Sequence, residues 1–277
     1  MSLWFRNELR VVLCPDQLIL LKVRASLTLS GWRREILDKL IVPCPKHESG
    51  DESWAAALAT LDVALPKYFD AKAQTTVVLS NHFVRYALIP WSDHLTNEQE
   101  ELYFAEHTFR EMYGNEADNW EIRISQNHAG KSQVASAVDK KLLAGLRELT
   151  DRHGIALSSV QPLLMLAYNQ SRAQLNNSNA WLVVVEQNYL CLMLLRNGQW
   201  SWVRTLRSGE NWVQDLPDLL EREAFLADSD VSTVYISAVQ QEKLPVGTHW
   251  NMQFLHVFSQ SGRHQENGLH YALYVNG

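Results

Sequence analysis

The residues that could do chemistry are spread along this sequence without the spacings that known catalytic motifs require. The sequence has no Gly-x-Ser-x-Gly elbow, no Walker-type phosphate loop and no Gly-x-Gly-x-x-Gly segment opening a helix. Its ten histidines form no His-x-x-x-His pair and its three cysteines form no Cys-x-x-Cys pair, so the common zinc-ligand spacings are missing. The motifs therefore predict no catalytic residue, no metal ligand and no cofactor.

The densest group of ionisable side chains lies on a predicted helix. Apolar residues recur there at helical spacing and predict one buried stripe, made of Leu102, Ala105, Phe109 and Met112. Thr96 followed by Gln99 matches a capping box and predicts the start of the helix, and Gly114 ends it. The rest of the helix surface is acidic, with glutamates at positions 98, 100, 101, 106 and 111.

This acidic surface has two interpretations. The first is a solvated face, favoured by the placement of negative charge in the first helical turn. The second is a docking face for a basic partner segment, with an exposed tryptophan as an anchor. On the second interpretation the candidate partner-binding residues are Trp91, Glu98, Glu100 and Glu101.

Composition limits the class of protein. The chain has 277 residues, 46% of them hydrophobic, which is enough for one large or two moderate cores. A net charge of −6 argues against non-specific binding of nucleic acid or anionic membranes. An odd number of cysteines without paired spacing is typical of reduced thiols. With no signal-peptide core and no apolar run near the ~20 residues of a membrane span, we expect a cytoplasmic chain.

The elements that must position these residues begin with a repeated pattern. Three short strands are predicted over residues 181–186, 189–195 and 199–206, separated by Gln187-Asn188 and by Asn197-Gly198. Asn-Gly is the strongest short hairpin signal, because type I′ turns need positive φ. Residues 10–13, 18–23 and 33–42 give a similar triple at the start of the chain. A single β-meander could occur in any sheet protein, but two such triples, each followed by a helical pattern, suggest two similar domains.

The remaining pattern mixes strands and helices, which predicts an α/β fold with helices packed on mixed sheets. The polar segment 176–179 places the domain boundary so that residues 1–177 form the first domain and 178–277 the second. Two closing strands are predicted over residues 252–257 and 270–275.

Three segments together resemble a known family. They are the hairpin strand ending in Val84–Trp91, the acidic helix over residues 98–112, and the stretch from Ala137 to Pro162. Their order resembles the cytoplasmic actin-like proteins of type IV pilus and type II secretion machines, the PilM and GspL group. The resemblance covers roughly residues 74–166. It implies two actin-like (ribonuclease-H-like) subdomains, the first of which carries the pilus/secretion-type insert, facing a cleft.

The first turn of each hairpin departs from that family's pattern. An actin-like ATPase places an acidic residue and a glycine there, so that backbone N–H groups can approach the phosphates. The first turn here is Cys14-Pro15-Asp16-Gln17 and the second is Glu186-Gln187-Asn188, neither with glycine. The adenosine-binding Gly-Gly would fall near Ser237-Ala238. Asp16 and Glu186 are therefore only relic positions, and the family's nucleotide-binding residues are not carried over.

The resemblance and these departures together favour a non-catalytic, stand-alone cytoplasmic scaffold of a pilus or secretion apparatus. Its partners would be the cytoplasmic tails of inner-membrane pilus or secretion proteins, or an assembly ATPase. The alternative is a divergent actin-like ATPase or sugar-kinase-like enzyme that still binds Mg-ATP. A ribonuclease-H-like nuclease would need several converging carboxylates, and only Asp16 and Glu186 are candidates.

Overall fold

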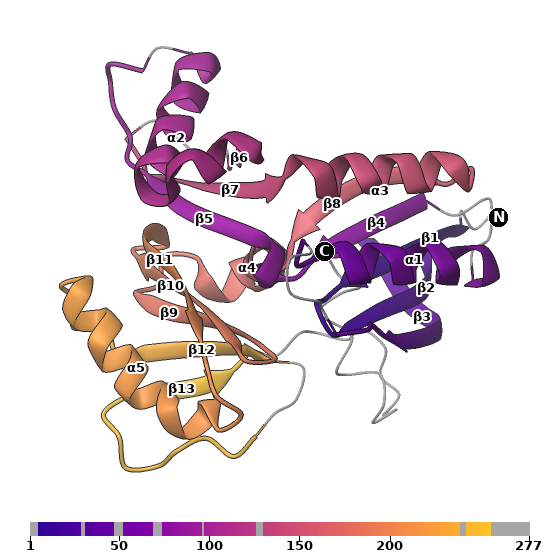
Figure 1. Ribbon diagram of the computed structural model, residues 1–277. Coiled ribbons are helices and arrows are strands. Elements are labelled where there is room, and N and C mark those ends of the chain that lie inside the picture. Colours follow the sequence, from indigo (N-terminus) through magenta and orange to yellow (C-terminus); the bar gives the residue numbers. More distant parts are fainter. Residues whose placement is uncertain are drawn as a thin grey trace. The chain divides into compact units, whose positions relative to one another are not determined.

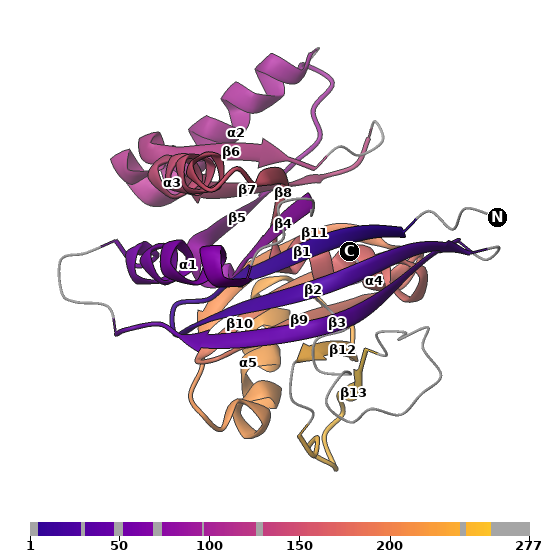
Figure 2. The same cartoon turned by 90° about the vertical axis from the view of Figure 1, so that its right-hand side faces the viewer.

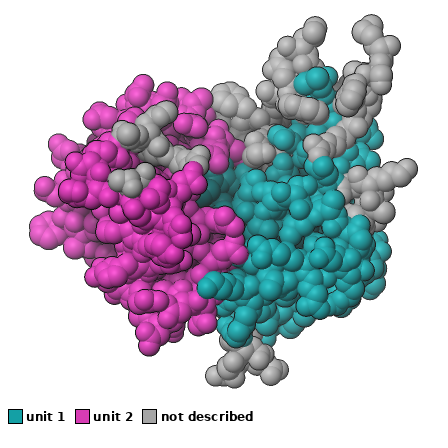
Figure 3. Space-filling view, turned by 90° about the horizontal axis from the view of Figure 1, so that it is seen from above, with its two compact units in different colours: residues 1–83, 139–166, 257–277 teal, residues 84–138, 167–256 magenta. Residues whose placement is uncertain are grey.

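The computed structural model describes residues 5–28, 31–46, 52–68, 74–95, 97–125, 130–238 and 242–255. The chain forms two compact units, each with its own five-stranded sheet (Figure 1, Figure 3). The first unit contains the described residues up to Phe83 together with Asp139–Leu166. The second contains Val84–Val138 and the described residues from Ala167 onward. The units are therefore not consecutive in sequence, because the chain crosses between them more than once.

The sheet of the first unit has the strand order β3-β2-β1-β4-β8. Its antiparallel half consists of β1 (Phe5–Leu13), β2 (Gln17–Thr28) and β3 (Gly31–Pro43). Two parallel strands extend it beyond β1, namely β4 (Gln74–Leu79) and β8 (Ala156–Pro162). Successive residues such as Val11 and Val12 are fully buried. Because successive strand residues point to opposite faces, both faces of this sheet are covered at β1.

Two helices of the first unit, α1 (Ala55–Tyr68) and α3 (Lys140–Arg152), contact each other (Figure 2). Gly145 allows this approach, since a Cβ atom there would lie 2.6 Å from Cδ2 of Leu58. The carboxylate of Asp62, in the middle of α1, holds the end of α3: it lies 2.8 Å from Nε2 of His153 and accepts from Nη1 of Arg152 at 3.0 Å. The hydrogen bond from His153 is the main reason that the pKa of Asp62 is lowered.

The sheet of the second unit repeats the same plan, with the order β11-β10-β9-β12-β13. Three antiparallel strands come first: β9 (Ala180–Glu186), β10 (Tyr189–Arg196) and β11 (Gln199–Arg207). Helix α5 (Trp212–Leu226) leads to the parallel strands β12 (Thr233–Ala238) and β13 (Asn251–Phe254). Two sheets of identical strand order confirm the predicted α/β fold with two similar subdomains.

The predicted hairpin turns in this sheet are present. Asn197 and Gly198 have φ values of 51° and 70°, the positive pair that a type I′ turn requires. The first of the two predicted closing strands corresponds to β13, and the second, over residues 270–275, lies outside the described residues. The predicted domain boundary at residue 177 lies shortly before β9, where the second copy of the strand order begins. The division of the chain at that residue stays a proposal.

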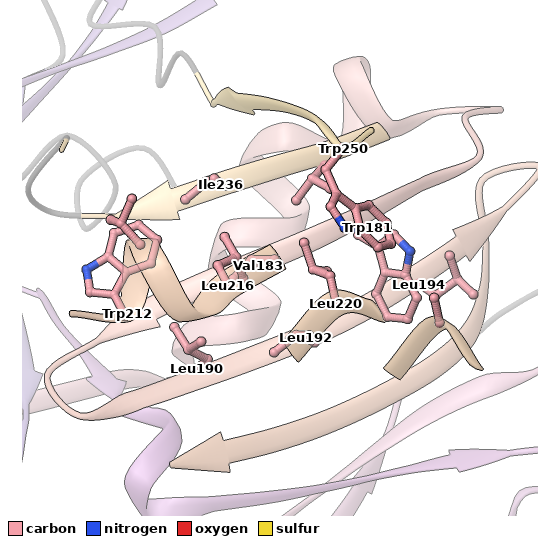
Figure 4. Close-up of a cluster of buried hydrophobic side chains, with 13 residues drawn as sticks. Trp181, Val183, Leu190, Leu192, Leu194, Trp212, Leu216, Leu220, Ile236 and Trp250 are labelled. Carbon is pink, nitrogen blue, oxygen red and sulfur yellow. The ribbon is translucent and has the colours of Figure 1, made fainter. Parts of the chain in front are cut away.

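Helix α5 covers the second sheet with an apolar core (Figure 4). Leu216 and Leu220 of the helix are fully buried, as are Trp181 and Ile236 of the sheet. The indole N–H of Trp181 donates to the carbonyl oxygen of Val231 at 3.1 Å. The fully buried tryptophan of this core therefore has its polar atom satisfied, as a buried tryptophan needs.

One carboxylate is buried on the same helix. Glu223 has 0% side-chain exposure and accepts hydrogen bonds from the indole N–H of Trp202 at 3.3 Å and from Nε and Nη2 of Arg222 at 3.2 Å each. Nη1 of Arg204 lies 3.5 Å from Oε2 of Glu223, the oxygen that also accepts from Trp202. Because Trp202 and Arg204 belong to β11, this cluster fixes α5 to the edge strand of the sheet.

The segment between β4 and α3 forms a small module of its own. Its sheet has the order β5-β7-β6, made of β5 (Val84–Ile89), β7 (Gln133–Asp139) and β6 (Trp120–Ile124). Helix α2 (Glu98–Tyr113) packs on it through the buried residues Ala105 and Phe109 (Figure 1). The sequence predicts an insert of this kind in the first domain, and that assignment stays a prediction. Residues 84–138, called the insert below, group with the second compact unit.

Two predicted details of α2 are wrong. Asn97, not Thr96, caps the helix: its Oδ1 accepts from the N–H groups of Gln99 and Glu100, and Thr96 lies outside the described residues. Met112, predicted to be buried, is 55% exposed. The buried stripe continues instead at Tyr113, whose ring stacks on that of Phe109 at 6.1 Å, because the helix turns through about 100° per residue.

Candidate functional site

A nucleotide site of the actin-like type would begin at the turn between β1 and β2. The N–H of Cys14 donates to the carbonyl oxygen of Gln17 at 3.0 Å, and the N–H of Cys44 donates to the carbonyl oxygen of Asp16 at 2.8 Å. Pro15 has no N–H to offer. The side chain of Asp16 is exposed. The backbone of this turn is thus used to close the hairpin and to hold the segment after β3.

The carboxyl end of β4 lies beside that turn, because β1 and β4 are parallel neighbours. The N–H of Ser80 donates to the carbonyl oxygen of Leu13 at 2.9 Å. Asn81 is fully buried, and its Oδ1 accepts from the N–H of Leu164 at 3.1 Å. Leu164 lies in the first turn of α4 (Leu163–Leu175), so Asn81 satisfies one of the free N–H groups at that helix start. These buried polar groups connect the sheet to α4.

The second turn joins β9 to β10. Asn188 has a φ of 57° and therefore occupies the left-handed conformation that glycine most often takes. Its carbonyl oxygen accepts from the N–H of Ser208 at 3.0 Å. Glu186 is half-buried at the end of β9, and its charge adds to burial in raising the pKa of the Cys191 thiol. Asn188 thus has the backbone conformation that glycine would adopt in this turn. Its carbonyl oxygen also holds the residue that follows β11.

Asp16 and Glu186 lie in different compact units. Within the part of the chain that the structure describes, no three His, Cys, Asp or Glu side chains are placed to hold a metal ion. Ser237 and Ala238, where the adenosine-binding glycines were expected, are residues of strand β12, and Ser237 is buried. They are therefore the last residues of that strand, and residues 239–241 that follow lie outside the described residues.

Helix α2 presents most of its acidic residues to solvent. Glu98, Glu106 and Glu111 are exposed, and Glu100 and Glu101 are half-buried. Three of these five glutamates lie in the first turn, where negative charge interacts favourably with the helix dipole. Trp91, which follows β5, is 45% exposed. The four predicted partner-binding residues thus lie in one module, and their role in binding stays a prediction.

Sequence reasoning missed the apolar residues that α2 leaves exposed. Tyr103, Phe104 and Met112 are 59%, 38% and 55% exposed. Phe104 and Met112 are eight residues apart, and Thr108 lies midway between them. Phe104, Thr108 and Met112 therefore lie on the same side of the helix, whereas Tyr103 does not. At about 100° per residue, Phe104 does not lie on the buried stripe formed by Leu102, Ala105 and Phe109. That helical phase could have identified Phe104 as an exposed apolar residue.

Among the described residues, no helix combines the length and the apolar character that crossing a bilayer demands.

No model of a known protein family matches this sequence, and no curated protein sequence matches it either. Solved structures do match its fold. The PilM–PilN type IV pilus biogenesis complex contains a chain with 16% identity and a TM-score of 0.63, with 96% of each chain covered. The cytoplasmic domain of EpsL, an inner-membrane component of the type II secretion system of Vibrio cholerae, has 10% identity and a TM-score of 0.57. That match covers 98% of this chain and 93% of the EpsL chain.

A third similar structure is a Bacteroides thetaiotaomicron protein of unknown function with an actin-like ATPase fold. It has 12% identity and a TM-score of 0.53, and the match covers 84% of this chain and 82% of that one. At these sequence identities, the structural similarity is evidence for the fold alone. Together with the twice-repeated strand order, these matches identify the chain as a protein with the actin-like fold, similar in structure to PilM and to the cytoplasmic domain of EpsL.

Proposed function

We propose that this protein is a non-catalytic scaffold in the cytoplasm, acting in the assembly of a type IV pilus or a type II secretion-like apparatus. Similarity over nearly the whole chain to PilM and to the EpsL cytoplasmic domain supports the choice of apparatus. The partners are then proteins: the cytoplasmic tails of inner-membrane components, or an assembly ATPase. The actin-like fold serves as a rigid frame that presents docking surfaces.

The observation that carries the non-catalytic part of this proposal is the structure of the two hairpin turns. A triphosphate needs several backbone N–H donors, a cation and a metal to offset its desolvation. Pro15 removes one donor from the first turn, and Asn188 replaces glycine in the second. A side chain at each of these positions keeps the backbone away from a phosphate, since only glycine allows the closest approach.

The size of this effect can be estimated. A charge-assisted hydrogen bond contributes about 1.5–3 kcal/mol, and about 1.4 kcal/mol corresponds to a tenfold change in affinity. The loss of three such bonds, about 4.5–9 kcal/mol, moves a micromolar site to millimolar or weaker. We therefore expect no binding of Mg-ATP at physiological concentration.

Isothermal titration of the full chain with Mg-ATP tests this proposal. We expect no saturable heat up to about 1 mM ligand, a range that spans the loss of two to three tenfold steps from a micromolar site. Micromolar binding that disappears in both Asp16→Ala and Glu186→Ala would instead favour the divergent ATPase. A matched control is Asp93→Ala, which removes an exposed carboxylate of the insert and should not change the titration.

The scaffold part of the proposal needs a separate measurement. The tagged protein, expressed in its source organism, should co-purify with inner-membrane pilus or secretion components or with their assembly ATPase, as identified by mass spectrometry. Co-purification with none of these, in a cell that assembles the apparatus, would contradict it.

A further inference from the structure

Helix α2 carries an apolar stripe that the described part of the chain leaves partly exposed to solvent. Phe104, Thr108 and Met112 are spaced four residues apart and so lie along one side of the helix. Phe104 is 38% exposed and Met112 55%. The hydroxyl of half-buried Thr108 donates to the carbonyl oxygen of Phe104 at 2.9 Å, so its polar atom is satisfied within the helix. Single exposed apolar residues are ordinary, but an aligned set has the pattern of a docking face.

The length of this stripe fits a helix. Eight residues at about 1.5 Å each place Phe104 and Met112 about 12 Å apart along the helix axis. A partner helix that packs alongside presents apolar residues at the same interval of about two turns. Methionine and an aromatic ring are side chains enriched in the cores of protein–protein interfaces.

Charge decides which kind of helix would fit. The helical phase of about 100° per residue places Glu100 and Glu111 along one side of the stripe and Glu101 in line with it, one turn before Phe104. Glu111 lies 3.8 Å from Nδ1 of His107, and both side chains are well exposed. The one arginine of the helix, Arg110, lies on another side and donates from Nε to Oδ1 of Asp118 at 3.1 Å. No lysine occurs in α2. The border of the stripe is therefore negative.

We infer that the side of α2 formed by Phe104, Thr108 and Met112 docks a basic amphipathic helix of a protein partner. Apolar side chains of that helix would cover the stripe, and its lysines or arginines would lie opposite Glu100, Glu101 and Glu111. Such a partner gains affinity from the apolar contact and orientation from the charges. This inference rests on the proposed function, because it gives the scaffold one specific docking surface.

The test uses labelled synthetic helices and the full-length protein, with binding followed by fluorescence anisotropy. The first probe has leucines at i, i+4 and i+8 flanked by lysines. The second has glutamates in place of the lysines, and the third is a scramble of the first with the same composition. We expect saturable binding of the first probe that weakens with added salt, and at least tenfold weaker binding of the other two. Equal binding of the scramble would overturn the inference, because charge alone would then account for it.

Variants locate the binding to this side of the helix. Phe104→Ser and the pair Glu101→Lys with Glu111→Lys should each weaken binding of the first probe at least fivefold. The matched controls are Tyr103→Ser and Glu106→Lys, which make the same kinds of change on the other side of α2 and should alter binding less than twofold. The charge-reversed pair lies at exposed or half-buried positions, so it remains folded if Phe104→Ser does not. Equal effects of test and control variants would refute the surface assignment.

The same variants separate other outcomes. If a second copy of this chain covers the stripe, the wild-type protein will be a dimer by light scattering and Phe104→Ser a monomer, which would overturn the choice of a basic partner. Failure of the peptide experiment leaves the Mg-ATP titration unaffected. Conversely, micromolar Mg-ATP binding would contradict the proposed function without changing where the basic helix binds.

Discussion

Replacement of the buried carboxylate of Glu223 should destabilise the second unit more than any exposed charge change on the same helix. Its partners set the magnitude. The indole N–H of Trp202 loses its acceptor in Glu223→Ala, and an unsatisfied buried donor costs about 1–3 kcal/mol. Arg204 and Arg222 are 48% and 56% exposed, so each can return to solvent and loses at most about 1 kcal/mol.

From these contributions we expect Glu223→Ala to lower the free energy of unfolding by about 2–4 kcal/mol, including the packing lost with the side chain. Glu223→Gln keeps the volume and leaves one carbonyl oxygen for Trp202. It should lose only the additional strength of charged hydrogen bonds, about 1–2 kcal/mol. We therefore expect the free energy of unfolding to decrease in the order wild type, Glu223→Gln, Glu223→Ala.

Urea unfolding, followed by tryptophan fluorescence, measures these differences in the free energy of unfolding. The matched control is Glu221→Gln, two residues earlier in α5, whose exposed carboxylate lies 3.6 Å from Nε2 of His249. It should change the free energy of unfolding by less than about 0.5 kcal/mol. If Glu223→Gln and Glu221→Gln have the same effect, the buried carboxylate does not hold α5 on β11, and the reasoning is refuted.

Three further predictions concern other parts of the chain. Asp62→Asn should lower the melting temperature at neutral pH, because the folded-state pKa of Asp62 is lowered by His153. The difference from wild type is present above the unfolded pKa of about 4 and should vanish as pH falls through the folded value, which a pH series of thermal melts would reveal. Gly198→Ala should destabilise by more than ~1 kcal/mol in urea unfolding, because φ is +70° and the new Cβ would lie 2.5 Å from the backbone nitrogen of Asn177. Charge reversal at Glu101 should change the unfolding free energy by ~0.5 kcal/mol or less, and a larger loss would mean that this side chain is buried.

The repeated strand pattern could be read from the sequence because its signals are local. A type I′ turn is determined by the two residues that must adopt positive φ, and Asn197-Gly198 meets that need whatever surrounds it. The apolar runs on both sides then fix the strands, and the order of runs and helices fixes the α/β class. The same holds for the missing phosphate turns, since Pro15 excludes an N–H donor in any fold.

The features that only the tertiary structure shows are those that depend on contacts between elements distant in sequence. Glu223 stands in the sequence beside charged neighbours and looks exposed, and it is buried only because α5 packs against β11. Asn81 accepts a hydrogen bond from Leu164, 83 residues later in the first turn of α4, a contact that no local pattern predicts. Nor could the sequence show that the insert groups with the second sheet, or that Met112 is exposed while Tyr113 is packed. Burial and long-range hydrogen bonds are properties of the assembled chain, whereas turns, strands and helix periods are properties of a few neighbouring residues.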